Sequence, residues 1–265
     1  MFHHDKRPQA AGTGAILAAW QRKRQLFAAA LVDNIKASQC LLCLARGRRH
    51  CLCPDCLRDL PWLGRACTGC ALPLPETAAD HRAGHDNDED RCQDCRLNAP
   101  PWQSVSALFR YEFPVDRLIS AFKYHGRLAL ADAFGSLLAD QLPPSWRPDL
   151  LLPVPLHEHR LRQRGYHQTA LLAGVMARRL GSASDWRGLR RLRDTAMQKT
   201  LDPQARLANL SEAFAWQGGT LAGRHVMLVD DVMTTGATLR TLTLPLLAAG
   251  AASVRIAVIA RTLPP

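Results

Sequence analysis

Four Cys-x-x-Cys pairs are the residues of this chain best suited to hold metal ions. They include eight of the nine cysteines, all between residues 40 and 95, and they are Cys40/Cys43, Cys53/Cys56, Cys67/Cys70 and Cys92/Cys95. Two intervening residues let both sulfurs of a pair face one ion, and two pairs complete a tetrahedral zinc site. The sequence therefore predicts two structural zinc sites, with iron–sulfur clusters or redox-active pairs as the alternatives.

The four pairs can share two ions in two ways. Consecutive pairing leaves nine residues between Cys43 and Cys53 and 21 between Cys70 and Cys92, whereas cross-braced pairing leaves 23 and 35. We favour consecutive pairing, because a shorter loop loses less entropy when it closes. His50 and Cys51 adjoin the second pair and could substitute as ligands, but we interpret them as spectators.

The cysteine-rich stretch lacks the apolar residues of a self-sufficient core. Between residues 37 and 100 the large apolar residues are ten leucines and Trp62, with no Val, Ile, Phe or Met. So small a core can hardly stabilise about 60 residues alone. A structural zinc ion contributes an apparent free energy of about 10–16 kcal/mol, which is enough to hold such a segment together.

A second set of residues has the order expected of a phosphate site. The apolar run 226–229 is followed by Asp230 and Asp231, and then by the turn Thr234-Thr235-Gly236-Ala237-Thr238 ahead of a predicted helix. Carboxylates at a strand end can accept hydrogen bonds from ribose hydroxyls, and the turn offers N–H groups to a phosphate. We expect the two acids to face a phosphorylated ribose rather than a salt-bridge partner. The alternative is an ordinary strand, turn and capped helix.

Arginine dominates a net charge of +11, since 29 of the 34 basic residues are arginines. Between His157 and Arg193 nine arginines stand against two acidic residues, and Arg160, Arg162 and Arg164 follow a predicted strand. The planar guanidinium group suits phosphate, so this arginine excess indicates phosphate-bearing partners. A solvated basic face and a surface that reaches nucleic acid are the alternatives.

Downstream of Trp102 the pattern alternates between strand and helix. We expect strands over 105–111, 150–154, 225–229 and 254–259, and helices over 114–124, 128–141, 167–180 and 237–248. This alternation is typical of an α/β fold with a mainly parallel sheet flanked by helices. The sequence contains neither the glycine-rich motif of dinucleotide-binding proteins nor the P-loop motif.

The N-terminal tail, residues 1–36, is predicted to contain an amphipathic helix. Its apolar residues recur at helical spacing and are Ile16, Trp20, Phe27, Leu31 and Ile35. We interpret it as a helix that packs on protein rather than as a membrane anchor. No run of 18 apolar residues occurs, and the charged stretch 21–25 interrupts the apolar segment of a signal peptide. We therefore expect a cytoplasmic protein without a membrane span.

Residues 226–238 resemble the motif with which type I phosphoribosyltransferases bind phosphoribosyl pyrophosphate (PRPP). Further motifs make the chain similar to the ComF/GntX family over roughly residues 37 to 262. They are the four cysteine pairs, Phe122-Lys123-Tyr124-His125-Gly126, Pro153-Val154-Pro155-Leu156, the stretch 160–168 and Thr195-x2-Gln198-x2-Leu201-x4-Arg206-x2-Asn209. His167 departs from the asparagine that the family usually has, which puts a polar role for this position in doubt.

The resemblance implies a type I phosphoribosyltransferase fold over 101–265, preceded by a double zinc ribbon over 37–100. It implies PRPP as the ligand, with Mg²⁺ on the pyrophosphate. The residues expected against PRPP are Asp230, Asp231, Thr234, Thr235, Gly236, Ala237 and Thr238. Those assigned to the pyrophosphate side are Arg160, Arg162, Arg164 and Lys123. Segment 195–209 resembles the loop that covers the site in such enzymes, with Lys199 and Arg206 as candidate phosphate contacts.

Two functions follow from the resemblance. The first is transfer of the phosphoribosyl group from PRPP to a nitrogen nucleophile, with mostly electrostatic catalysis and no assigned general base. The second is a non-enzymatic role in DNA uptake or single-stranded DNA handling, with PRPP as a sensed ligand. Competence proteins such as a helicase or a recombination mediator would then be partners. The sequence does not identify the acceptor or the oligomeric state.

Overall fold

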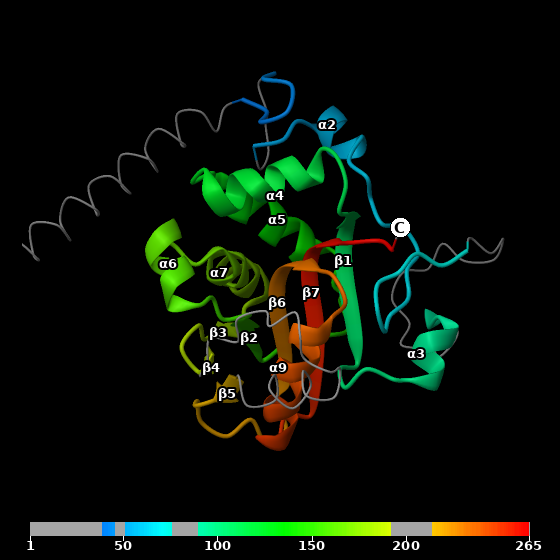
Figure 1. The fold of residues 1–265 in the computed structure, drawn as a ribbon, viewed down its shortest axis with the longest axis vertical. Coiled ribbons are helices and arrows are strands. Elements are labelled where there is room, and N and C mark those ends of the chain that lie inside the picture. Colours follow the sequence, from blue (N-terminus) through cyan, green and yellow to red (C-terminus); the bar gives the residue numbers. More distant parts are fainter. Residues whose placement is uncertain (1–38, 46–50, 76–89, 192–213, 265) are drawn as a thin grey trace, which may run out of the picture.

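The computed structural model describes residues 39–45, 51–75, 90–191 and 214–264 (Figure 1). The predicted N-terminal helix, His50 and segment 195–209 with Lys199 and Arg206 lie outside these ranges. No helix in the described ranges is long and apolar enough to cross a membrane.

A five-stranded sheet forms the centre of the molecule, and every pairing within it is parallel. In sheet order its strands are β1 (Ser104–Arg110), β7 (Ser253–Arg261), β6 (His225–Met233), β2 (Leu150–Pro153) and β3 (Ala183–Ser184). The three middle strands are rich in buried Val, Ile and Leu, as expected when helices cover both faces of a parallel sheet. This architecture confirms the predicted fold class.

Helices cover both faces of the sheet (Figure 1). Met227 and Val229 of β6 share a buried cluster with α4 (Val115–Tyr124), α5 (Ala129–Asp140) and α7 (Gln168–Leu180). Val226 and Leu228 share the other cluster with α9 (Ala237–Ala248). Neighbouring residues of a strand point to opposite faces, which explains why β6 contributes to both clusters.

The predicted helices agree with the observed ones to within one residue at each end, but other elements differ from the expectation. Strand β6 extends to Met233, beyond its expected end at residue 229, because it continues to pair with β7 after its pairing with β2 has ended. The arginine-rich stretch forms a helix, α6 (Glu158–Arg164), that buries none of its residues and so carries no apolar pattern. The short strands β4 (Leu189–Arg191) and β5 (Phe214–Trp216) form a second, antiparallel sheet.

The cysteine-rich segments pack directly on the α/β fold. Trp62 forms an antiparallel bridge with Phe109 of the edge strand β1, and the two rings lie 4.6 Å apart. The Leu63 N–H donates to the Leu108 carbonyl at 2.9 Å, and the Arg110 N–H donates to the Pro61 carbonyl at 2.8 Å. The segment therefore covers an edge of the sheet that would otherwise expose unpaired backbone groups.

Close packing between α5 and α7 gives a test of this fold. A methyl group at Gly135 on α5 would lie 2.8 Å from Cβ of Val175, whereas one at Gly174 on α7 would meet only the end of the Arg178 side chain, at 3.8 Å. We expect Gly135→Ala to lower the free energy of unfolding by about 1–3 kcal/mol. Gly174→Ala should raise it by about 0.5–1 kcal/mol, since alanine favours the helix. Urea unfolding measures both, and a stabilising Gly135→Ala would contradict the packing.

Candidate functional site

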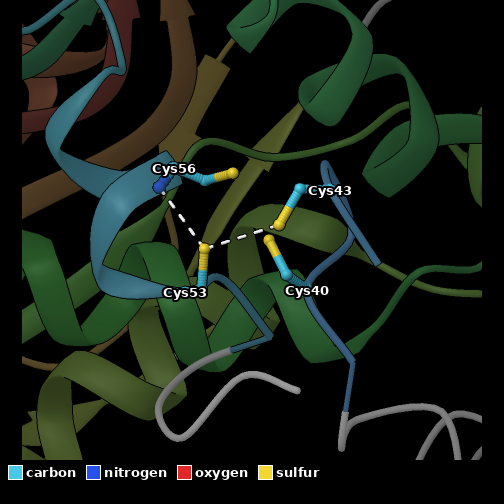
Figure 2. Close-up of side chains that lie close together, drawn as sticks. All are labelled: Cys40, Cys43, Cys53 and Cys56. Carbon is cyan, nitrogen blue, oxygen red and sulfur yellow. Dashed lines mark hydrogen bonds between the residues drawn. The ribbon is translucent and has the colours of Figure 1, made fainter. Parts of the chain in front are cut away.

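The first four-cysteine group consists of Cys40, Cys43, Cys53 and Cys56, whose sulfur atoms all lie within 4.8 Å of one another (Figure 2). The Sγ atoms of Cys43 and Cys53 are 3.6 Å apart. A tetrahedral ion with bonds of about 2.3 Å to sulfur holds its ligands about 3.8 Å apart, whereas a disulfide needs about 2 Å. The spacing therefore fits a metal site and not a disulfide.

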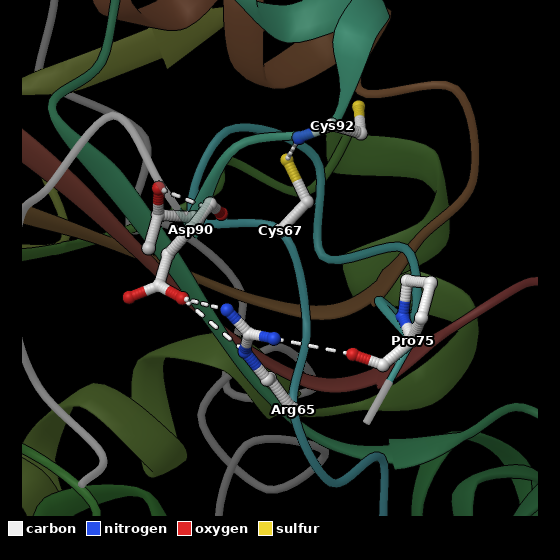
Figure 3. A network of polar contacts seen from close by, with 6 residues as sticks. Arg65, Cys67, Pro75, Asp90 and Cys92 are labelled. Atoms are coloured by element: carbon white, nitrogen blue, oxygen red, sulfur yellow. Dashed lines mark hydrogen bonds and ion pairs between the residues drawn. The ribbon is translucent and has the colours of Figure 1, made fainter. Parts of the chain in front are cut away.

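The second four-cysteine group consists of Cys67, Cys70, Cys92 and Cys95, again with all sulfurs within 4.8 Å. Sγ of Cys70 and Sγ of Cys92 are 3.7 Å apart. The fully buried Sγ of Cys67 accepts hydrogen bonds from the N–H groups of Gly69 at 3.3 Å and Cys92 at 3.2 Å (Figure 3). Both groups follow the consecutive pairing that the loop lengths favour.

Hydrogen bonds prepare the buried sulfurs to act as thiolates. The pKa of Cys67 falls to about 4, chiefly through its hydrogen bond with the Cys70 thiol, while burial opposes the fall and backbone N–H groups assist it. Burial raises the pKa of Cys40, but backbone N–H groups outweigh it and bring the value to about 6. Within each group the partner thiols Cys56 and Cys70 have raised pKa values instead. A cation that displaces the remaining protons satisfies all four sulfurs at once.

An ion pair between Arg65 and Asp90 lies beside the second four-cysteine group (Figure 3). Nη2 of Arg65 lies 3.0 Å from Oδ1 of Asp90, and Nη1 of Arg65 donates to the Pro75 carbonyl at 3.1 Å. The Thr68 N–H donates to the Asp90 carbonyl at 2.8 Å. These contacts tie residues 75 and 90, on either side of segment 76–89, to residues 65–68 next to Cys67.

The two acids at the end of β6 have different surroundings. Asp231 is buried, forms an ion pair with Nζ of Lys123 at 2.7 Å and accepts a hydrogen bond from Nε2 of Gln168 at 3.2 Å. The expectation that this acid has no salt-bridge partner is therefore wrong. The strand continues through both acids, so they point to opposite faces, and Asp231 faces α4 and α7. Lys123, which was expected on the pyrophosphate side, therefore lies beside Asp231.

The negative charge of Asp230 is stabilised by fewer contacts than that of Asp231. Its Oδ1 accepts the Asp231 N–H at 2.8 Å. Burial and the Asp231 carboxylate raise the pKa of Asp230, that N–H and Lys123 oppose the rise, and the resulting value is about 8. At neutral pH the pair therefore carries mainly one negative charge, which Lys123 balances.

The turn after the acids leaves helical N–H groups available. Gly236 has a φ of 77°, and a Cβ there would lie 2.7 Å from Cε of Met233 and 3.3 Å from the Trp102 ring, so this position requires glycine. Helix α9 begins directly after Gly236 with no side-chain cap at its N-cap residue and no acidic residue in its first turn, and the Ala237 N–H donates to Oγ1 of Thr235 at 3.4 Å. Thr234, Thr235 and Thr238 are exposed. An anion fits this helix start because it can accept the N–H groups.

The three arginines lie on α6, which follows the carboxyl end of β2. Strand β2 pairs with β6 up to Pro153 and Val229, so the loop after β2 and the acid pair leave the sheet at the same edge. Arg162 forms an ion pair with Glu158 at 2.9 Å, and both side chains are exposed. The guanidinium of Arg164 lies 4.8 Å from the centre of the Tyr124 ring. The structure thus brings the arginines to this edge, with Arg160 and Arg162 exposed and Arg164 half-buried against Tyr124.

His167 has a polar role despite its departure from the family pattern. It is the N-cap of α7, where Nδ1 lies 3.2 Å from the Ala170 N–H, while Nε2 lies 3.2 Å from the Leu156 N–H of the loop after β2. Burial lowers the pKa of His167 to about 4, so the ring is neutral at pH 7. Sequence reasoning also missed Gln168, which donates a hydrogen bond to Asp231. The available hint was its position directly after His167, at the end of the family-like stretch 160–168.

The buried imidazole gives a pH test. The unfolded histidine binds its proton near pH 6.5 and the folded one only near pH 4, so stability is lost as the pH falls through this window. We expect His167→Asn to keep the N-cap hydrogen bond. The difference in the free energy of unfolding between pH 7.5 and pH 4.5 should shrink by about 1–3 kcal/mol, because asparagine does not titrate. His167→Ala should also lose about 1 kcal/mol at pH 7. Urea unfolding at pH 7.5 and pH 4.5 checks this, and an unchanged pH dependence in His167→Asn would refute it.

Part of the chain matches a family model named the phosphoribosyl transferase domain, over residues 170–263. The match begins in α7 and includes β6, the turn, α9 and β7, and thus the acid pair and the start of α9. Among solved structures, glutamine PRPP amidotransferase from B. subtilis, complexed with ADP and GMP, has a TM-score of 0.38 and 19% identity, covering 52% of this chain and 30% of that chain. At this TM-score the likeness carries no argument.

Curated relatives match over most of their length. DNA utilization protein YhgH from Salmonella typhi is 33% identical over 218 residues, which cover 80% of this chain and 91% of that protein. Competence protein F from Haemophilus influenzae is 29% identical over 216 residues, covering 76% of this chain and 87% of that protein. With the phosphoribosyltransferase domain and the two four-cysteine groups, these matches show that the chain belongs to the ComF/GntX family.

Proposed function

We propose that the protein binds PRPP at the carboxyl edge of its sheet and displaces pyrophosphate from C1 of the ribose with a nitrogen nucleophile. The observation that carries this proposal is the order of groups at the end of β6. A compensated acid pair is followed at once by a glycine turn and by a helix whose N-cap residue has no side chain to accept its N–H groups. The matched phosphoribosyltransferase domain includes all of these groups.

Each part of this edge suits one part of PRPP. The N–H groups at the start of α9 can hold the 5-phosphate. The acids adjoin the turn and can bind the ribose hydroxyls, with protonated Asp230 as a donor and Asp231 as an acceptor. The arginines of α6 lie across from the turn, after the neighbouring strand β2, and can reach a pyrophosphate group.

Mg²⁺ fits the donor chemistry of this edge, because it binds through one or two carboxylates together with the phosphates of a substrate. Asp230 and Asp231 are the residues that would hold it. When bound, it would neutralise charge on the pyrophosphate as the C1–O bond breaks. The new bond joins C1 to the nucleophile's nitrogen, whose proton leaves to solvent. This chain's residues would contribute orientation and electrostatic stabilisation of the developing charges.

The acid pair provides the main test. We expect the double change Asp230→Asn, Asp231→Asn to weaken PRPP by about one and a half to three decades in Kd, because Asp231 loses a charged hydrogen bond worth roughly 1.5–3 kcal/mol and protonated Asp230 a neutral one worth roughly 0.5–1.5 kcal/mol. Asp230→Asn alone imitates the protonated acid and should cost about tenfold or less at pH 7. Calorimetry with PRPP and Mg²⁺ measures the affinities.

Asp140→Asn is the matched control, because this exposed acid at the end of α5 lies outside the proposed site and forms an ion pair with Arg179 at 2.5 Å. It should bind PRPP as the parent does. Circular dichroism of each variant separates lost binding from lost folding. A folded double variant with parental affinity would exclude the proposed PRPP site.

A second candidate function is DNA handling without turnover. It is supported by the names of the relatives, which refer to DNA utilization and to competence. The exposed Arg160 and Arg162, with the half-buried Arg164 stacked on the exposed Tyr124, offer a basic, aromatic surface to a single strand. Pyrophosphate release with a panel of nitrogen acceptors would favour the enzyme, whereas salt-dependent binding of single-stranded DNA without release would favour this role.

We further propose that both four-cysteine groups hold zinc, which their sulfur spacing supports. Reduced, freshly purified protein should contain two zinc ions per chain by elemental analysis. Cys43→Ser should lose one ion, because serine is a poor ligand for zinc. Cys51→Ser should retain both, since Cys51 is buried beside the first group without belonging to either group. Protein that contains iron, or no metal, would contradict the proposal.

A further inference from the structure

We infer that Arg261 is a positioning residue that ties the phosphate-binding turn to the second four-cysteine group, so that the turn keeps its shape only while that group is intact. The inference rests on the proposed function in one respect, because it takes the turn as the seat of a phosphate. It goes beyond that function by giving the second group a role at the ligand site. No motif in the sequence assigns such a role to Arg261.

The Arg261 guanidinium bridges two parts of the chain that are far apart in sequence. Arg261 ends β7 opposite Met233, and its side chain is buried. Its Nε donates to the carbonyl of Cys70 at 2.7 Å. Its Nη1 donates to the carbonyl of Met233 at 3.2 Å and also to that of Thr234. Hydrogen bonds from a charged donor are stronger than neutral ones, so this side chain fixes both backbones.

These bonds also orient the groups that would meet a phosphate. In a trans peptide the carbonyl and the N–H of the same unit point in opposite directions. Because the Thr234 carbonyl points to Arg261, the Thr235 N–H must point away from it, toward the open side of the turn. Arg261 therefore sets the direction of an N–H group at the proposed phosphate seat without touching the ligand.

Trp102 provides a second bridge between the same two places. Its Nε1 donates to the carbonyl of Gly69, between Cys67 and Cys70, at 2.8 Å. Its ring packs below Gly236, where a Cβ would come within 3.3 Å of it. Gly69 itself has no room for a side chain, because a Cβ there would lie 2.7 Å from Sγ of Cys95. A shift of this sulfur group would therefore be transmitted to the turn through two side chains.

The first four-cysteine group has a different location. Cys40 and Cys53 belong to the buried cluster of α4 and α5, whereas Trp102 and Met233 belong to the cluster of α9. Figure 1 shows the same separation, with α2 (Pro54–Arg58) beside α4 and α3 (Gln93–Leu97) beyond the other end of β1. Coupling to the turn is thus expected from the second group alone.

The test compares two buried arginines of one strand. Arg255 on β7 is 9% exposed, against 8% for Arg261, but it lies about 20 Å away along the strand, where it contacts Gln103 and the Trp146 ring. We expect Arg261→Met to weaken both PRPP and ribose 5-phosphate about tenfold or more, since both ligands carry the 5-phosphate. Arg255→Met should change either affinity less than about twofold. Arg261→Lys, which keeps the charge but loses the planar fork, should fall between.

Hydrogen exchange of the ligand-free protein tests the coupling between the second four-cysteine group and the turn without relying on PRPP binding. Amides of residues 234–238 should exchange faster in Arg261→Met than in the parent, and Arg255→Met should not have this effect. Cys92→Ser, in the second group, should reproduce the faster exchange, whereas Cys43→Ser, in the first, should not. If the parent fails to bind PRPP while these exchange patterns appear, the proposed function fails and the coupling stands. Unchanged exchange in both Arg261→Met and Cys92→Ser would overturn the coupling.

Discussion

The parallel pairing of β6 with β2 on one side and β7 on the other is the constraint on which the site depends. Parallel strands end at one edge of a sheet, so the loop before α6, the acid pair and Arg261 meet there although they lie about 100 residues apart in the chain. None of these groups could form the site from its own segment. The apolar residues of β6, buried toward both helical layers, hold this edge in place.

Helices and cysteine groups, which depend on residues close together in the chain, could be predicted from the sequence. Helical periodicity gave α4, α5, α7 and α9 almost to the residue, and the cysteine spacing predicted both metal groups together with their pairing. Helix α6 was not predicted, because a helix without a fully buried residue has no apolar face to detect. The extension of β6 through Asp230 and Asp231 also escaped, because it depends on pairing with β7.

Contacts between distant side chains had no signal in the sequence. The ion pair between Asp231 and Lys123 joins β6 to α4, and the bond from Arg261 to the Cys70 carbonyl spans 191 residues. The weak core of the cysteine-rich stretch explains why such contacts exist. Ten leucines and one tryptophan cannot bury themselves, so the stretch completes its core against β1 and the helices of the α/β fold. Docking of this kind gives metal sites a physical connection to the edge of the sheet.

The charges buried at this edge favour an anionic ligand. Asp231 and Lys123 balance each other, Asp230 is mainly protonated below pH 8, and Arg261 remains positive although burial lowers its pKa. Carbonyl oxygens surround the Arg261 guanidinium, but no carboxylate pairs with it in the contacts of the described residues. A buried cation is costly, and negative charge close by reduces that cost; the Cys70 and Cys95 sulfurs already oppose the burial that lowers the pKa of Arg261, and an anion on the turn would add to their effect. A phosphate on the turn would therefore be attracted both by the N–H groups that it touches and by an arginine that it does not touch.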